Sequence, residues 1–255
     1  MFYEKLFDLT HKVALVTGAA GGLAFETCLG LGQFGATLAL ADIDSKGLAK
    51  VSDQLRRKRI QTWSKVVDVS DQGSVESLIN VLVRKFGKLD ILINFAGVVW
   101  TNPVEKIRTL EFEKVIDINL KGSFLLAQKA LRVMTPRRSG KIILVGSVSG
   151  QIGRPFAAHY SASKGGVHSL VRTLAVERAK QNIQINAIAP VFTLTNLSES
   201  VLSDPKLKRS ILSTIPMGRL GLPSDLVGTM IFLSSAASNF ITGQTFCVDG
   251  GCTIS

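Results

Sequence analysis

Cysteine and histidine are scarce in this chain, and their spacing excludes two classes of site. Cys28, Cys247 and Cys252 are an odd number and form no C-x-x-C pair, so a disulfide framework is not expected. Their pattern is typical of reduced thiols packed in the interior of a cytoplasmic protein. The three histidines have no metal-ligand spacing with any cysteine. We therefore expect no bound metal.

Long apolar runs are missing as well. No stretch reaches the roughly eighteen residues that a membrane-spanning helix needs. Residues 1–5 also lack the basic end and apolar stretch that mark a secretory signal. We therefore expect a cytoplasmic protein with no membrane partner. The 255 residues are 46% hydrophobic and 19% charged, which suits one large domain that spans residues 1–255.

Acidic residues are outnumbered by basic ones, and the formal net charge at pH 7 is +11. Basic clusters lie at 56–59, at 137–138 and among 206–209. The first ends a helical pattern, where cations favour the helix dipole and solvent, and the second lies in a predicted turn. A solvated surface is the favoured explanation, and attraction of an anionic substrate or partner is the alternative. Nucleic acid is not expected as a partner, because no aromatic residues alternate with the basic ones.

Strand-like and helix-like segments alternate along the chain. Short apolar, β-branched runs occupy residues 13–17, 37–41, 62–69, 91–95, 142–145, 185–189 and 246–248. Segments of helical periodicity lie around residues 22–34, 45–58, 72–86, 109–134, 158–180 and 224–236. The nearly continuous hydrophobicity of the first set indicates strands buried on both faces. The alternation predicts an α/β Rossmann fold, with one doubly wound, seven-stranded parallel sheet flanked by helices.

A doubly wound sheet binds its ligands beyond the carboxyl ends of the strands. The one long irregular segment, 192–216, is therefore a candidate for a lid over the substrate. Side chains around 98–102, 149–156 and 192–216 are expected to set substrate specificity.

A glycine-rich turn follows the first predicted strand. Gly18, Gly21 and Gly22 precede Leu23 and a helix, so backbone N–H groups and the helix N-terminus can approach a pyrophosphate. A tight connection without a ligand is the alternative for such a turn alone. Asp42 ends the second strand about twenty residues later, where a carboxylate binds a ribose 2′-hydroxyl and repels the 2′-phosphate of NADP. With no lysine or arginine at 42–44, the sequence predicts NAD(H) as the cofactor.

The spacing Gly18-x-x-x-Gly22-x-Ala24 resembles the TGxxxGxG turn of the short-chain dehydrogenase/reductase family, and the similarity extends over the whole chain. Ala24 replaces the last glycine of that pattern. Asp68-Val69 resembles the family's adenine-binding pair, and residues 94–97 resemble its NNAG motif on the adenosine side of the cleft. The cofactor-binding residues that the turn and the resemblance imply are Gly18, Gly21, Gly22, Leu23, Asp42, Asp68, Val69, Asn94, Ala96, Gly97, Tyr160, Lys164, Thr193 and Thr195.

Tyr160 and Lys164 stand at i and i+4, so on a helix their side chains lie one turn apart on one face. A nearby ammonium lowers the pKa of a tyrosine from its ordinary value of about 10 toward the range of acid–base catalysis. The family resemblance adds Ser147, which polarises the substrate oxygen, and Asn119, which supports a proton relay through water. It implies that Tyr160 protonates or deprotonates the substrate oxygen and that Lys164 also binds the nicotinamide ribose.

Two segments near the end of the chain extend the resemblance. Residues 186–195 resemble the family's NxxxPGxxxT motif, and imply that Thr195 and the backbone at Thr193 meet the nicotinamide carboxamide. Val191 stands where the family has glycine, and its β-branched side chain predicts an extended backbone there. Residues 248–251 resemble a closing strand that packs across a subunit interface, which implies a homotetramer.

Three functions remain open at this stage. The first is an NAD-dependent oxidoreductase that transfers a hydride between nicotinamide and a carbonyl or secondary alcohol, with a polyol or sugar acid as the small-molecule substrate. The second is a 3-oxoacyl-(acyl-carrier-protein) reductase of fatty-acid synthesis, whose acidic carrier protein would suit the basic surface. The third is a non-catalytic nucleotide sensor. Asp42 favours the first over the second, and the intact Ser147, Tyr160 and Lys164 disfavour the third.

Overall fold

The computed structural model describes residues 3–194 and 204–255. Its centre is a seven-stranded sheet in the order β3-β2-β1-β4-β5-β6-β7, and every neighbouring pair of strands is parallel. The strands are β1 (Val13–Thr17), β2 (Thr37–Asp42), β3 (Thr62–Val66), β4 (Ile91–Asn94), β5 (Gly140–Val145), β6 (Ile183–Pro190) and β7 (Thr245–Val248). This confirms the predicted doubly wound parallel sheet, with its topological switch between β1 and β4.

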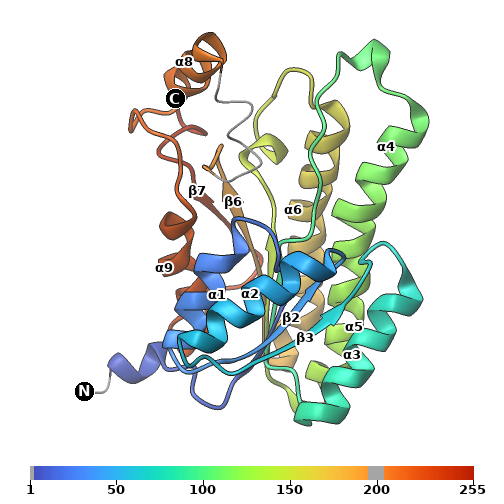
Figure 1. Cartoon of the computed structure of the whole chain (residues 1–255), viewed down its shortest axis with the longest axis vertical. Helices are drawn as coiled ribbons and strands as arrows, with labels where there is room; N and C mark the ends of the chain where they lie inside the picture. Colours follow the sequence, from blue (N-terminus) through green and yellow to red (C-terminus); the bar gives the residue numbers. More distant parts are fainter. Residues whose placement is uncertain (1–2, 195–203) are drawn as a thin grey trace.

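Helices cover both faces of the sheet (Figure 1). They are α1 (Ala24–Gln33), α2 (Ser45–Arg57), α3 (Gln72–Phe86), α4 (Thr109–Ile116), α5 (Gly122–Arg137), α6 (Ala158–Arg178), α8 (Pro205–Ser213) and α9 (Pro223–Ser234). Short 3₁₀ turns occupy Glu4–Phe7, Val104–Lys106, Val148–Gly150, Ala179–Gln181 and Ala236–Ser238. No helix in the described ranges is long and apolar enough to cross a membrane.

The sheet is buried between two apolar layers. Helices α1, α2 and α9 pack on one face through residues such as Leu31, Leu55 and Met230. Helices α3, α5 and α6 pack on the other face through residues such as Leu78 and Leu126. Every residue of β1, β4, β5 and β6 is buried, which explains the nearly continuous apolar runs in the sequence.

The helices that follow the first strands begin at acidic caps. The side chain of Asp44 accepts a hydrogen bond from the backbone N–H of Lys46 at 3.1 Å at the start of α2. Asp71 does the same for the N–H of Ser74 at 2.6 Å at the start of α3. Gly87, with φ of 72°, ends α3 in the left-handed conformation that glycine adopts without strain. These local signals mark where α2 and α3 begin and end, and the parallel pairing places the carboxyl ends of the strands at one edge of the sheet.

Two predicted boundaries differ from the structure. The helix expected over 109–134 is divided into α4 and α5 by one π-helical turn, Asp117–Lys121. The segment 192–216 was expected to be irregular, but it contains α8, which Asp204 caps by accepting from the N–H of Lys206 at 2.8 Å. Residues 195–203 of that lid candidate, including Thr195, lie outside the described residues.

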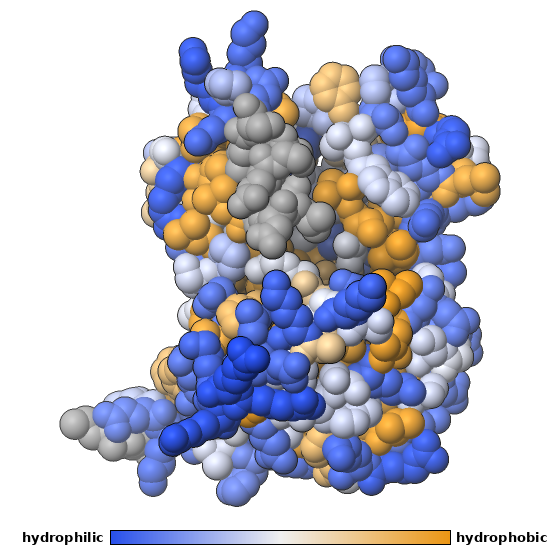
Figure 2. Space-filling view, viewed as in Figure 1, coloured by the Kyte–Doolittle hydropathy of each residue, from blue (hydrophilic) through white to orange (hydrophobic). Residues whose placement is uncertain are grey.

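Three smaller expectations also need correction. The third strand ends at Val66 rather than at residue 69. Arg137 is the last residue of α5 and pairs with Asp90 at 2.9 Å, so of the predicted pair only Arg138 lies in the turn. Cys28 and Cys252 are buried as expected, but Cys247 is exposed. The prediction for 56–59 fits the structure, because all four side chains are exposed at the end of α2. Hydrophilic side chains gather over this helix (Figure 2).

Candidate active site

The glycine turn leaves β1 in a conformation that only glycine accommodates. Gly18 has φ of 69°, and a Cβ atom there would lie 2.4 Å from the backbone nitrogen of Ala96, in the loop after β4. Gly21 donates its N–H to the oxygen of Gly18 at 3.1 Å, which closes the turn. Gly21 and Gly22 are exposed just before α1. The open backbone at a helix N-terminus therefore fits a pyrophosphate group.

The two residues that lead into α1 complete the turn. Leu23 is half-buried at the position before the helix, and Ala24 is its first residue. Ala24 is 0% exposed and belongs to the apolar layer beneath α1. The methyl group that stands in place of the family's glycine hydrogen is therefore packed within the core.

Asp42 is fixed beside the turn by two backbone groups. Its Oδ2 accepts from the N–H of Ala20 at 2.9 Å, and its Oδ1 accepts from the N–H of Asp44 at 2.9 Å. Each carboxylate oxygen has a second lone pair, so both can still accept from a hydroxyl group. The side chain thus has a defined direction at the end of β2, next to the exposed glycines.

The residues predicted to bind adenosine divide into two kinds. Asp68 and Val69 follow β3, where Asp68 Oδ1 accepts from the N–H of Ser70 at 2.8 Å and Val69 is buried. Ala96 is half-buried and Gly97 is exposed, so both can line a cleft.

Asn94 is different, because it is 2% exposed and its amide is used within the protein. Its Oδ1 accepts from the hydroxyl of Thr17 at 2.6 Å and from the N–H of Ala96 at 3.0 Å. Its Nδ2 donates to Ser123 Oγ at 2.9 Å. Asn94 therefore shapes the loop after β4.

The predicted catalytic side chains converge from three elements. Ser147 follows β5 and is 5% exposed, and its Oγ accepts from the N–H of Ser149 at 3.1 Å. Tyr160 and Lys164 lie on α6, with Lys164 Nζ 5.8 Å from the centroid of the Tyr160 ring. Lys164 Nζ also donates to the backbone oxygen of Val145, two residues before Ser147, at 2.8 Å. The strand end and the helix are thus joined at the site.

Burial dominates the titration of both groups. Burial raises the pKa of Tyr160 above its ordinary value, while hydrogen bonding by Ser147 and the positive charge of Arg154 act to lower it. Burial lowers the pKa of Lys164 to about 8, so the side chain remains an ammonium at pH 7. The sequence predicted Lys164 as the group that lowers the tyrosine pKa. In the structure the groups that act to lower this pKa against burial are Ser147 and Arg154, and the net pKa of Tyr160 is raised.

Asn119 lies on the π-helical turn and is 0% exposed. Its Oδ1 accepts from the N–H of Val98 at 2.8 Å, and its Nδ2 donates to the oxygen of Val98 at 2.9 Å. Nδ2 also donates to Ser163 Oγ at 3.0 Å. A Cβ atom on Gly97 would lie 3.1 Å from Asn119 Oδ1 and 3.4 Å from Lys164 Nζ. Asn119 therefore fastens the loop after β4 beside Lys164.

Of the predicted nicotinamide contacts, only one lies in the described residues. Thr193 is 9% exposed, its Oγ1 donates to the oxygen of Val191 at 2.8 Å, and its backbone pairs with Gly221. Val191 does not adopt a positive φ, as its β-branched side chain predicts. Thr195 lies outside the described residues.

His168 is a buried neighbour of the site that the sequence analysis did not single out. It is 3% exposed, and a Cβ atom on Gly146 would lie 2.1 Å from its Nε2. Burial, followed by the charges of Lys164 and Arg172, lowers its pKa to about 4. The imidazole is therefore neutral at pH 7 and packs beneath the backbone that leads to Ser147. The glycines at 146 and 150, which make room for it, were the signal available in the sequence.

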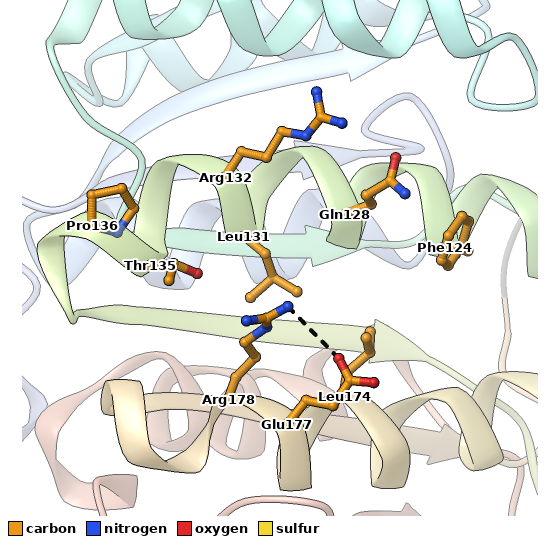
Figure 3. Close-up of a pocket in the computed structure, with 9 residues that line it drawn as sticks. All are labelled: Phe124, Gln128, Leu131, Arg132, Thr135, Pro136, Leu174, Glu177 and Arg178. Carbon is orange, nitrogen blue, oxygen red and sulfur yellow. Dashed lines mark ion pairs between the residues drawn. The ribbon is translucent and has the colours of Figure 1, made fainter.

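A surface groove of about 500 Å³ between α5 and α6 is separate from this site (Figure 3). Leu131 of α5 points into the groove, and the neighbouring residues Glu177 and Arg178 pair with each other on its α6 side at 3.7 Å. None of the predicted cofactor or catalytic residues lines it. In residues 3–194 and 204–255, no group of three or more His, Cys, Asp or Glu could hold a metal ion.

Comparison with known proteins agrees with this geometry. A family model described as enoyl-(acyl carrier protein) reductase matches residues 18–253. Gluconate 5-dehydrogenase of Gluconobacter oxydans is 34% identical over 100% of both chains. The 3-oxoacyl-(acyl-carrier-protein) reductase of Staphylococcus aureus is 39% identical over 94% of this chain and 97% of its own.

Among solved structures, a gluconate 5-dehydrogenase from Burkholderia cenocepacia in complex with NADP and tartrate is similar to this chain, with a TM-score of 0.94. It is 33% identical, and the match covers 98% of each chain. With the sheet order, the glycine turn and the Ser147–Tyr160–Lys164 array in place, these matches assign the family. This chain belongs to the short-chain dehydrogenase/reductase family, and is an oxidoreductase that acts on a CH–OH group and uses a nicotinamide cofactor.

Proposed function

We propose that this enzyme uses NAD(H) and interconverts a secondary alcohol and a carbonyl in a small hydroxylated substrate, a polyol or sugar acid. The observation that carries the proposal is the fixed carboxylate of Asp42, which lies at the end of β2, on the same edge of the parallel sheet as Ser147 after β5. In this proposal a single domain, residues 1–255, both binds the cofactor and carries the catalytic residues.

The catalytic roles follow from the side chains that converge after β5. Tyr160 gives its hydroxyl proton to the substrate oxygen in reduction and takes it back in oxidation. Ser147 hydrogen-bonds the same oxygen and holds it near the phenol. Lys164, an ammonium at pH 7, is fixed by Val145 and binds the nicotinamide ribose. The nicotinamide, when bound, supplies or accepts the hydride. The protein's contribution is to orient the two reactants and to move the proton.

NAD(H) is proposed over NADP(H) because Asp42 faces the position of the ribose. A carboxylate held by two N–H groups cannot rotate away from a 2′-phosphate, and no basic residue stands at 42–44 to compensate. The Burkholderia cenocepacia relative was crystallised with NADP, so family membership alone does not decide the cofactor.

A sugar acid or polyol is proposed on the polar character of the site and on the relatives. The Gluconobacter oxydans relative is a gluconate dehydrogenase, and the Burkholderia cenocepacia structure holds tartrate, a hydroxylated dicarboxylate. The competing function is a 3-oxoacyl-(acyl-carrier-protein) reductase that uses NADPH. The higher identity of the Staphylococcus aureus relative favours that function, and Asp42 disfavours it. A non-catalytic sensor is disfavoured by the complete Ser147–Tyr160–Lys164 array.

Assembly belongs to the same proposal. We propose a homotetramer, because residues 248–251 resemble the closing strand that packs across subunits in this family. The mass of the purified protein, measured by light scattering after gel filtration, tests this directly. A monomer at micromolar concentration contradicts it.

The deciding assay is turnover of a substrate panel with both cofactors. Polyols, sugar acids and an acetoacetyl thioester are compared by absorbance at the NADH band, with NAD(H) and with NADP(H). The proposal predicts that the best polyol or sugar acid with NAD(H) exceeds the thioester in kcat/KM. A thioester advantage of about ten-fold or more with NADPH, roughly 1.4 kcal/mol in the barrier, would assign the enzyme to the reductase function.

A further inference from the structure

Arg154 is a half-buried cation in the loop that connects Ser147 to α6. Its guanidinium lies over the ring of Phe192, with Cζ 5.5 Å from the ring centroid. Within residues 3–194 and 204–255, no hydrogen bond or ion pair engages the guanidinium. A cation that loses water without gaining a hydrogen-bonding partner is costly, and such groups cluster at binding sites.

Arg137 and Arg219 are the matched comparison within the chain. Arg137 pairs with Asp90 at 2.9 Å, and Arg219 holds both oxygens of Asp225, at 2.6 Å and 3.0 Å. Both therefore have carboxylate partners within the fold, as structural arginines do. Among the described residues, the partner of Arg154 is the aromatic face of Phe192, which orients a planar guanidinium and leaves its N–H donors available.

The position of Arg154 brings those donors near the loops that carry Ser147 and Thr193. Phe192 follows β6 and precedes Thr193, so the stacked pair links the loop after β5 with the loop after β6. The positive charge of Arg154 also reaches Tyr160, where it acts to lower the pKa that burial raises. A cation close enough to affect the tyrosine lies within reach of the far end of a substrate whose reacting oxygen meets Tyr160.

We propose that Arg154 binds the carboxylate of a hydroxy-acid substrate, with Phe192 as the platform that orients its guanidinium. The inference rests on the proposed function and narrows it from hydroxylated molecules in general to anionic ones. Two parallel N–H···O bonds from a guanidinium match the geometry of a carboxylate, and a lysine cannot reproduce that fork.

The test compares three probes that share one carbon chain. D-gluconate carries a carboxylate at C1 where D-glucitol carries a primary alcohol, and D-glucitol 1-phosphate carries a phosphate at that same end of the chain. The kcat/KM of each is measured for the unmodified enzyme and for the Arg154→Gln and Arg154→Lys variants. Arg84→Gln is the control, because this exposed arginine lies in the last turn of α3, at the edge of the sheet where β4 begins, away from the site.

The expected result is a fall of about 10- to 100-fold in kcat/KM for D-gluconate in Arg154→Gln, with D-glucitol changed by less than about two-fold. Arg154→Lys is expected to lose less, and Arg84→Gln to match the unmodified enzyme. An equal fall for gluconate and glucitol overturns the inference, because it indicates a structural role. Preference for the phosphorylated probe, lost in Arg154→Gln, also overturns it in favour of a phosphate.

A binding measurement separates this inference from the proposed function. Binding of D-gluconate to the enzyme loaded with NADH is followed by the change in NADH fluorescence. If no probe is turned over, the proposed function fails for this substrate class, and the binding measurement still tests Arg154. Gluconate binding weakened about ten-fold or more in Arg154→Gln supports the inference, and unchanged binding overturns it.

Discussion

The turn after β1 and the loops after β5 and β6 lie at the same edge of one sheet, but they hold their ligand-facing groups in different ways. On the nucleotide side, which is the turn after β1 together with Asp42, the backbone sets the geometry. Gly18 needs a positive φ, Gly21 closes the turn through its N–H, and the N–H groups of Ala20 and Asp44 fix Asp42. Little on this side depends on the titration of a side chain.

The substrate side is made of side chains that are buried at a cost. Burial shifts the pKa of Tyr160, Lys164 and His168 away from their ordinary values, and Arg154 has no carboxylate partner in the described ranges. One edge of the sheet therefore combines a cofactor site fixed by backbone hydrogen bonds with a catalytic site whose buried side chains have shifted pKa values. Changes on the two sides should therefore affect different quantities: cofactor affinity on one, and rate or pH dependence on the other.

The largest expected effect is on kcat, and it comes from a substitution among the catalytic side chains that leaves the cofactor site unchanged. Tyr160→Phe removes the proton donor and keeps the ring, so kcat should fall by roughly 10²- to 10⁴-fold, the usual share of general acid–base catalysis. NADH affinity, measured by fluorescence titration, should remain within about two-fold, because the hydroxyl is not part of the nucleotide side. Full turnover by Tyr160→Phe on a confirmed substrate would show that the assigned mechanism is wrong.

Acid should destabilise the substrate side through His168. Its pKa is about 4 in the folded protein and about 6.5 in the unfolded chain, so the unfolded state binds more protons between these values. The free energy of unfolding should therefore fall by about 3 kcal/mol as pH drops from 6.5 to 4, and this share should be absent in His168→Asn.

The measurement is urea unfolding at a series of pH values. His11→Asn is the matched control, because His11 is exposed and Asn tolerates its φ of 64°. An unchanged pH slope in His168→Asn would contradict the assignment of a buried, neutral imidazole.

Gly18→Ala should break the nucleotide side alone. The added Cβ would lie 2.4 Å from the nitrogen of Ala96, and φ of 69° is strained for alanine, so we expect a loss of about 2 kcal/mol in stability and weaker NADH binding. Gly228→Ala is the control, because nothing lies within 4 Å of its Cβ position on α9. If Gly18→Ala bound NADH as tightly as the control, the close approach of turn and loop would not matter for the cofactor.

The difference between the backbone-built cofactor site and the side-chain-built catalytic site also explains which residues could be predicted from the sequence. Gly18 and Asp42 could be predicted as cofactor-binding residues, because local residue patterns and spacings indicate backbone turns and strand ends. Arg154 and His168 were missed because their roles arise from packing between segments distant in the sequence, Phe192 in one case and Gly146 in the other. The π-helical turn that carries Asn119 was also missed, since helical periodicity continues through one extra residue. The start of α8, in contrast, had a readable signal in Asp204-Pro205.

The smallest predicted effect lies in Asp42, which recognises one hydroxyl rather than the whole cofactor. Asp42→Ala should narrow the preference for NADH over NADPH, mainly by improving NADPH binding. Asp53→Ala removes the same charge from an exposed position on α2 and should leave the preference unchanged.

The most direct test of the account is therefore the ratio of the two dissociation constants for the unmodified protein, NADPH over NADH, measured by fluorescence titration at one ionic strength. We expect a ratio of about ten or more, because a fixed carboxylate facing a phosphate costs at least about 1.4 kcal/mol. A ratio of one or less would contradict the preference for NADH, and would mean that Asp42 does not recognise the ribose 2′-hydroxyl.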